Sequence, residues 1–317
     1  MKRFLLPLFC LCLISCGGNN SGEATPSVSP SAFDTNIKSI DITTSEGVFD
    51  GLTAGPTDGT PVILLHGFPT TADQYTDIIK TLAAEGYYVI APNQRGFAPE
   101  MRPSNPEAYH PSLRTQDVID MANTLGIYRF HLAGHDSGAL TAWILAAMYP
   151  DRVITLTAMS VPHPQAIIDN FFANNDVVEI EREGYVADFT SEGFEETFVA
   201  NDHEYMRWIY EDTPQDSIDL YVEKLGDVET VDAILNYYRT RDWTWILTYG
   251  ASAITVPTLQ IWGDADSYVS ISSMERSEGY VVAEYHFEIL EGVSHWVTET
   301  AADDVSALML VHLQDRY

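Results

Sequence analysis

The chain has 317 residues, with 46 acidic side chains against 16 basic ones and a formal net charge of −30. That charge argues against binding to nucleic acid or to an anionic lipid surface, because both carry charge of the same sign. Hydrophobic residues make up 45% of the sequence, which indicates a folded core rather than an acidic disordered chain.

The N-terminal residues have the pattern of an export signal. Lys2 and Arg3 precede an apolar run that ends at Ile14 and is too short to span a bilayer comfortably, so we predict a signal peptide over residues 1–15. The segment Leu-Ile-Ser-Cys ending at Cys16 resembles a bacterial lipobox. This resemblance implies a lipid on Cys16 and anchoring in the bacterial cell envelope, with the following glycine favouring the outer membrane. An ordinary secretory signal is the alternative.

Residues 16–35 are expected to form a flexible tether behind this lipid, because Gly, Ser, Asn and Pro dominate them. The membrane would then be contacted only through the lipid. Cys10 and Cys12 leave with the signal, so Cys16 is the last cysteine, and neither a disulfide nor a thiol nucleophile is expected. The remainder, about 285 residues, suits one large domain or one domain with an insertion.

The first half of the folded part alternates strand and helix patterns. Residues 61–65 are an unbroken apolar run, typical of a parallel strand that is buried on both faces. A helical pattern at 75–85, a second strand at 87–91 and an amphipathic helix at 115–125 follow. This order predicts an α/β fold with a parallel sheet, and functional residues are expected in the loops after the strands.

The next strand, at 130–133, leads into a glycine-flanked turn and an apolar helix, which together predict a nucleophile elbow. Gly134 and Gly138 bracket Asp136 at its centre. A carboxylate is ionised at neutral pH and can attack carbon without a base, forming an ester with the enzyme. Ser137 lies one position out of frame, which argues against a serine esterase. An acidic turn before a core helix, without catalytic meaning, is the alternative.

Four short motifs together resemble the epoxide hydrolase and dehalogenase branch of the α/β-hydrolase family. They are HGFP at 66–69, QRGFAPEMRP at 94–103, GHDSGA at 134–139 and VPHP at 161–164. The resemblance extends from about Ile40 onward and implies the α/β-hydrolase fold, in which helices flank a mostly parallel central sheet and a helical cap is inserted. The core would comprise residues 36–163 and 256–317, and the cap residues 164–255.

The resemblance also implies the remaining catalytic groups. Strands are expected at 153–160, 256–263 and 285–290. A segment similar to W-G-x-x-D makes Asp266 the acid of a triad, with Asp264 as the alternative. A segment similar to G-x-x-H-W makes His295 the base, and it completes the chain order nucleophile, acid, histidine. The backbone N–H groups of Phe68 and Ser137 would form an oxyanion hole.

Two cap tyrosines have counterparts among epoxide hydrolases. Tyr185 stands four residues before a phenylalanine, and Tyr238 lies in the segment LNYYR, which resembles L-N-W-Y-R with Tyr237 in place of tryptophan. An epoxide leaves as an alkoxide, and two phenol groups on its oxygen would stabilise the developing charge. Packing within the cap is the alternative role. His66, His135 and Trp296 are expected, with Tyr237, to shape the pocket.

The function implied is hydrolysis of a small apolar epoxide to a vicinal diol through an ester on Asp136, without metal or organic cofactor. One alternative is a haloalkane or haloacid dehalogenase with the same triad. Ser137 argues against it, because haloalkane dehalogenases usually place tryptophan there and fluoroacetate-type relatives place arginine. Another alternative is a surface lipoprotein that binds a small molecule without catalysis. The oligomeric state is left open.

Overall fold

The structure is a computed structural model, and it describes residues 35–174, 177–314 and 316. The predicted signal peptide, Cys16 and all but the last residue of the predicted tether lie outside the described residues. Among the helices that the structure describes, none combines the length and the apolar composition needed to cross a membrane.

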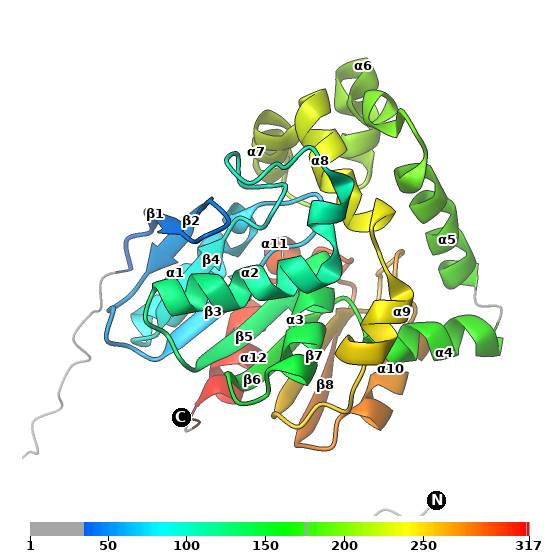
Figure 1. Ribbon diagram of the computed structural model, residues 1–317. Helices are drawn as coiled ribbons and strands as arrows, with labels where there is room; N and C mark the ends of the chain where they lie inside the picture. Colours follow the sequence, from blue (N-terminus) through cyan, green and yellow to red (C-terminus); the bar gives the residue numbers. More distant parts are fainter. Residues whose placement is uncertain (1–34, 175–176, 315, 317) are drawn as a thin grey trace, which may run out of the picture. The chain divides into compact units, whose positions relative to one another are not determined.

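An eight-stranded sheet with the order β1-β2-β4-β3-β5-β6-β7-β8 forms the centre of the fold (Figure 1). Strands β1 and β2 run antiparallel to their neighbours, and all other pairs are parallel. The strands are β1 Lys38–Thr43, β2 Val48–Ala54, β3 Pro61–Leu65, β4 Tyr88–Pro92, β5 Phe130–His135, β6 Val153–Met159, β7 Thr258–Gly263 and β8 Tyr285–Leu290. The predicted, mostly parallel sheet is confirmed, with two antiparallel strands added at one edge.

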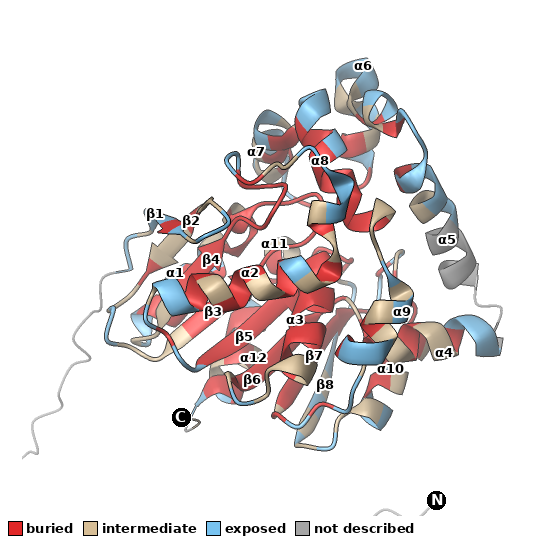
Figure 2. Ribbon diagram, in the orientation of Figure 1, coloured by how far each residue is buried: buried red, intermediate tan, exposed pale blue. Residues whose placement is uncertain are grey.

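Helices cover both faces of this sheet, which is why its central strands are apolar on both sides (Figure 2). Val62 and Leu64 of β3 belong to one hydrophobic cluster, and Ile63 and Leu65 belong to the other. The first cluster includes residues of α1 and α12, and the second includes residues of α2 and α3. These helices are α1 Thr76–Ala84, α2 Pro111–Thr124, α3 Ser137–Met148 and α12 Ala302–Leu313.

The chain between β6 and β7 is helical, as expected for a cap, and Figure 1 shows α5 to α8 grouped apart from the sheet. Its elements are α4 Pro164–Asn174, α5 Val177–Thr190, α6 Phe194–Trp208, α7 Gln215–Leu225, α8 Val228–Arg239, α9 Trp243–Trp245 and a π-helical turn, Ile246–Gly250. Helix α6 is interrupted by non-helical backbone at residues 200–203. An aromatic cluster that includes Phe189, Phe198 and Tyr221 joins the cap to Phe68 and Trp296 of the core.

Several element boundaries differ from the sequence prediction, and two elements begin two or more residues away from the predicted start for backbone reasons. Helix α2 begins at Pro111 rather than at residue 115, because proline is well tolerated in the first helical turn, where His110 accepts a hydrogen bond from the Ser112 N–H. Strand β7 begins at Thr258 because Pro257 has no N–H to donate to a neighbouring strand. The remaining elements are η1 Ala72–Tyr75, η2 Pro106–Tyr109, α10 Ile271–Arg276, η4 Ser277–Tyr280 and α11 Val297–Thr300.

Candidate active site

Asp136 occupies the sharp turn between β5 and α3. Its φ of 49° and ψ of −122° are unusual for a residue with a side chain, and such strained backbone is typical of functional turns. A Cβ atom added at Gly134 would collide with the Gly138 carbonyl, and one added at Gly138 would collide with the Leu65 carbonyl. The turn therefore needs glycine on both sides of Asp136, as the motif predicted.

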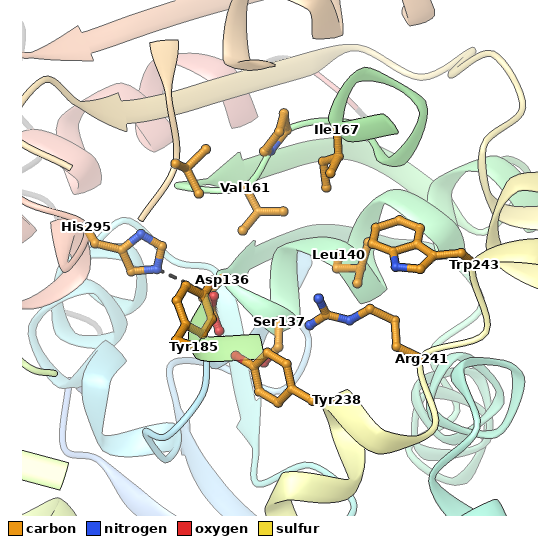
Figure 3. A pocket seen from close by; sticks show the side chains of 12 residues that line it. Asp136, Ser137, Leu140, Val161, Ile167, Tyr185, Tyr238, Arg241, Trp243 and His295 are labelled. Atoms are coloured by element: carbon orange, nitrogen blue, oxygen red, sulfur yellow. Dashed lines mark ion pairs between the residues drawn. The ribbon is translucent and has the colours of Figure 1, made fainter. Parts of the chain in front are cut away.

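Three predicted catalytic side chains meet at this turn. The Nε2 atom of His295 lies 3.5 Å from Asp136 Oδ2 (Figure 3). The other ring nitrogen of His295, Nδ1, donates a hydrogen bond to Asp266 Oδ2 at 2.9 Å. Asp264 is exposed, and its carboxylate accepts a hydrogen bond from the Gly292 N–H instead. The contact geometry thus selects Asp266 over Asp264 as the partner of the histidine.

Buried hydrogen bonds fix the orientation of Asp266 and His295. The Oδ1 atom of Asp266 accepts from the N–H groups of Tyr268 at 2.8 Å and Val269 at 2.9 Å. The backbone carbonyl of His295 accepts from Ser160 Oγ at 2.8 Å, and His135 Nε2 lies 2.9 Å from the same oxygen. The imidazole is therefore held from both its backbone and its ring, which preserves its orientation toward Asp136.

Asp136 and His295 form an ion pair at neutral pH. Burial opposes the charge of Asp136, but hydrogen bonding to His295, the positive charge of that residue and the Phe68 N–H lower its pKa to about 2. Burial likewise opposes the charge of His295, yet the carboxylates of Asp266 and Asp136 raise its pKa to about 10. The Asp136 carboxylate is thus ionised, and the histidine is protonated while Asp136 keeps its charge.

Two backbone N–H groups face the region of Asp136. The Phe68 N–H donates to Asp136 Oδ1 at 2.8 Å, next to the cis peptide bond between Phe68 and Pro69. Ser137 is the first residue of α3, where backbone N–H groups have no acceptor within the helix and the helix dipole favours negative charge. Both groups are in position for the predicted oxyanion hole.

Tyr185 of α5 and Tyr238 of α8 line the same two cavities as Asp136 and His295. Figure 3 shows both side chains extending from the cap toward Asp136. Their rings are 6.5 Å apart and nearly perpendicular. Burial, followed by the negative charge of Asp136, raises the pKa of Tyr238 well above its ordinary value. Its phenol therefore keeps its proton at neutral pH and can act as a hydrogen-bond donor.

The candidate catalytic side chains border two cavities of different size. The smaller has a volume of about 40 Å³ and the larger about 730 Å³, and Asp136, Tyr185, Tyr238 and His295 border both. Aromatic residues dominate the wall of the larger cavity: Phe68, Phe189, Tyr205, Trp208, Tyr268 and Trp296. This arrangement suits a substrate with one short and one bulky apolar substituent.

Of the residues expected to shape the pocket, Trp296 lines the larger cavity, whereas His66, His135 and Tyr237 line neither of the two. These three are fully buried behind the walls. His66 Nε2 accepts from the Gln94 N–H at 3.0 Å, and burial lowers its pKa to about 4. Burial also lowers the pKa of His135 to about 3. Both imidazoles are neutral, and they support backbone next to the site instead of facing a substrate.

Three residues near the site were not predicted from the sequence. Ser160, at the end of β6, holds the His295 carbonyl. Glu211 lines the larger cavity, and burial raises its pKa. Arg241 lines the smaller cavity and follows the LNYYR motif by two positions, which was the available signal. Among the described residues, no group of three or more His, Cys, Asp or Glu side chains could hold a metal ion.

Comparison with known proteins gives one family and several similar chains. The sequence profile of the alpha/beta hydrolase fold matches residues 60–302. Epoxide hydrolase A of Mycobacterium tuberculosis is 28% identical over 292 residues, covering 80% of this chain and 91% of the relative. Epoxide hydrolase 4 of Mus musculus is 24% identical over 279 residues, covering 84% and 76%. The crystal structure of Epoxide Hydrolase A from Mycobacterium thermoresistibile, 24% identical, has a TM-score of 0.77 and covers 89% of this chain and 99% of its own.

Proposed function

The chain belongs to the α/β-hydrolase fold family and is an epoxide hydrolase-like hydrolase; on this premise, we propose that it opens epoxides to vicinal diols through a covalent ester on Asp136. The observation that carries the proposal is the pairing of an ionised carboxylate at the elbow with two phenols across the same cavity. The carboxylate supplies a nucleophile, and the phenols serve a leaving group that departs as an alkoxide.

In the first step, an Asp136 carboxylate oxygen attacks an epoxide carbon and forms a C–O ester bond, while the ring C–O bond breaks. The O–H groups of Tyr185 and Tyr238 stabilise the departing oxygen, and one of them supplies its proton. The raised pKa of Tyr238 supports this role, because the phenol is protonated before the reaction. The product of this step is a hydroxyalkyl ester of Asp136.

Ester formation changes the charge balance around His295. The Asp136 carboxylate is one of the two groups that raise the pKa of His295, and esterification removes its charge. The pKa of the histidine then falls, so that the imidazolium can give its proton to the tyrosine that lost one in the first step, and the neutral imidazole can act as a base. The nucleophile and the base are thereby made available in turn, since the histidine becomes basic only after the carboxylate has reacted.

In the second step, His295 takes a proton from water, and the resulting hydroxide attacks the ester carbonyl carbon. The N–H groups of Phe68 and Ser137 stabilise the negative oxygen of the tetrahedral intermediate. Asp266 stabilises the imidazolium and maintains its orientation. In the collapse of the intermediate, the remaining proton of the attacking water ends on the diol oxygen and the Asp136 carboxylate is restored. His295 keeps the proton that it took from water and is again the cation of the resting ion pair.

The test is a panel of terminal and internal epoxides and of chloroalkanes, with diol and chloride measured side by side. We expect diol from epoxides, and no diol from Asp136→Ala. Chloride release without diol formation would favour a dehalogenase. Such an enzyme would use Asp136, Asp266 and His295 in the same way, but it would not need the phenols, because a halide leaves without a proton. Binding of epoxides without either product would favour a non-catalytic role.

A further inference from the structure

We propose that the smaller cavity is a subsite for a carboxylate substituent of the epoxide, bound by the guanidinium of Arg241 and the hydroxyl of Ser137. The inference rests on the proposed function and names its substrate class: epoxides with a carboxylate on or next to one ring carbon and an apolar, preferably aromatic, group on the other side.

Two buried polar atoms without a hydrogen-bond partner belong to residues that line this cavity. Arg241 enters from the cap, directly after α8, and Ser137 enters from the core at the start of α3 (Figure 3). Arg241 Nε and Ser137 Oγ are both buried and have no hydrogen-bond partner among the described residues. Buried polar atoms are nearly always paired, so two such atoms at one cavity indicate a ligand that satisfies both.

Arg241 also has no ion-pair partner among the residues that the structure describes. Its guanidinium lies 4.6 Å from the Tyr238 ring centre and hydrogen-bonds to the phenol of that residue, which is neutral and leaves the charge of Arg241 uncompensated. The guanidinium of Arg114 lies 4.1 Å from the centre of the neighbouring Tyr237 ring, and Arg114 likewise has no ion pair in the described part of the chain. By contrast, Arg95 pairs with Asp117, Arg207 with Asp219 and Arg239 with Glu195.

Among the residues that line the smaller cavity, the charges of Asp136 and His295 offset each other, so the guanidinium of Arg241 leaves one positive charge. This charge sets the preference for an anion despite the net charge of −30. Salt screens exposed charges beyond about 8–10 Å, whereas a ligand in the cavity is much nearer to Arg241. The other non-catalytic walls of the cavity are largely apolar and include Leu140, Val161 and Ile167. A single guanidinium in an apolar wall matches the fork geometry of a carboxylate, to which arginine can donate two parallel hydrogen bonds.

The cavity volume limits how the carboxylate is attached. About 40 Å³ accommodates about three water-sized groups, enough for a carboxylate alone or with one methylene. The larger cavity, of about 730 Å³ and lined by aromatic rings, accommodates the remaining substituent. A 3-aryloxirane-2-carboxylate therefore fits both cavities, with its ring carbons between Asp136 and the two tyrosines.

The experiment compares 3-phenyloxirane-2-carboxylate with its methyl ester in the wild type, Arg241→Met and Arg207→Met. We expect the wild type to prefer the acid, and Arg241→Met to reduce the acid-to-ester ratio of kcat/KM by about tenfold or more, as for loss of a hydrogen bond to a charged group. Arg207→Met removes the same charge from the larger cavity, where Arg207 is paired with Asp219. It should leave the ratio unchanged.

The inference is overturned if the wild type prefers the ester, or if Arg241→Met keeps the wild-type ratio. If Arg241→Met does not fold, Arg241→Lys keeps the charge but loses the fork, and an unchanged ratio in that variant would also contradict the proposal. Calorimetric binding of 2,3-dihydroxy-3-phenylpropanoate, the diol product, tests the carboxylate subsite separately from the proposed epoxide-opening activity. If no epoxide is turned over, the proposed function fails, and the subsite stands only if this acid binds to the wild type and not to the Arg241 variant.

Discussion

The pKa of His295 should depend on the charge of Asp136, and the variant Asp136→Asn tests this dependence. The facing atoms of the two side chains are 3.5 Å apart. At an effective dielectric constant of about 20, two unit charges at that separation interact with about 4.7 kcal/mol, which corresponds to about 3.5 pKa units. Removing the anion destabilises the imidazolium, so the pKa of His295 should fall from about 10 toward the ordinary value of about 6.5.

Titration of the His295 ring by NMR between about pH 4 and pH 11 measures this fall directly. Asp264→Asn is the matched control, because it removes the same charge from an exposed carboxylate that faces the Gly292 N–H. We expect the control to titrate like the wild type. An unchanged pKa in Asp136→Asn would refute the argument that ester formation converts His295 into a base. An ordinary pKa in the wild type would refute the ion pair itself.

The other predictions concern the phenols, the turn and the anchor. Tyr238→Phe should slow ester formation about 100- to 1000-fold in single-turnover kinetics, the cost of one donor to a developing oxyanion, while the exposed Tyr249→Phe should not. Gly138→Ala should lower the free energy of unfolding by about 1–3 kcal/mol through overpacking against Leu65, measured by denaturant unfolding, whereas Gly279→Ala, in open space, should not. We also propose that Cys16 carries lipid; Cys16→Ser should then move the protein from the membrane to the soluble fraction of the host, and an unchanged distribution would count against an anchor there.

The sheet was predictable where its strands are buried on both faces. Strands such as β3 are continuous apolar runs, and that composition identifies them without knowledge of their neighbours. Strands β1 and β2 were missed because they lie at the edge and carry partly exposed polar residues. Their register depends on the pairing of β1 with β2 and of β2 with β4, contacts that local sequence does not encode.

The core part of the candidate site followed from motifs at strand ends. Asp136, Asp266 and His295 come after β5, β7 and β8, and parallel strands bring their carboxyl ends to one edge. The position of Arg241 depends instead on how the cap packs over the core. His66 and His135 are fully buried because other parts of the fold pack over them, and this packing is not visible in the local sequence. Residue type alone does not distinguish a histidine that faces the substrate from one that supports the wall.

The most direct measurement of the central claim follows oxygen during a single turnover in water enriched in oxygen-18. If Asp136 attacks carbon and the ester is hydrolysed at its carbonyl, the label enters the Asp136 carboxylate, and the first diol released contains no label. Mass spectrometry of the diol and of the peptide that contains Asp136 reads both outcomes. Label in the diol and none in the peptide would contradict the covalent mechanism, because water would then have attacked the epoxide directly.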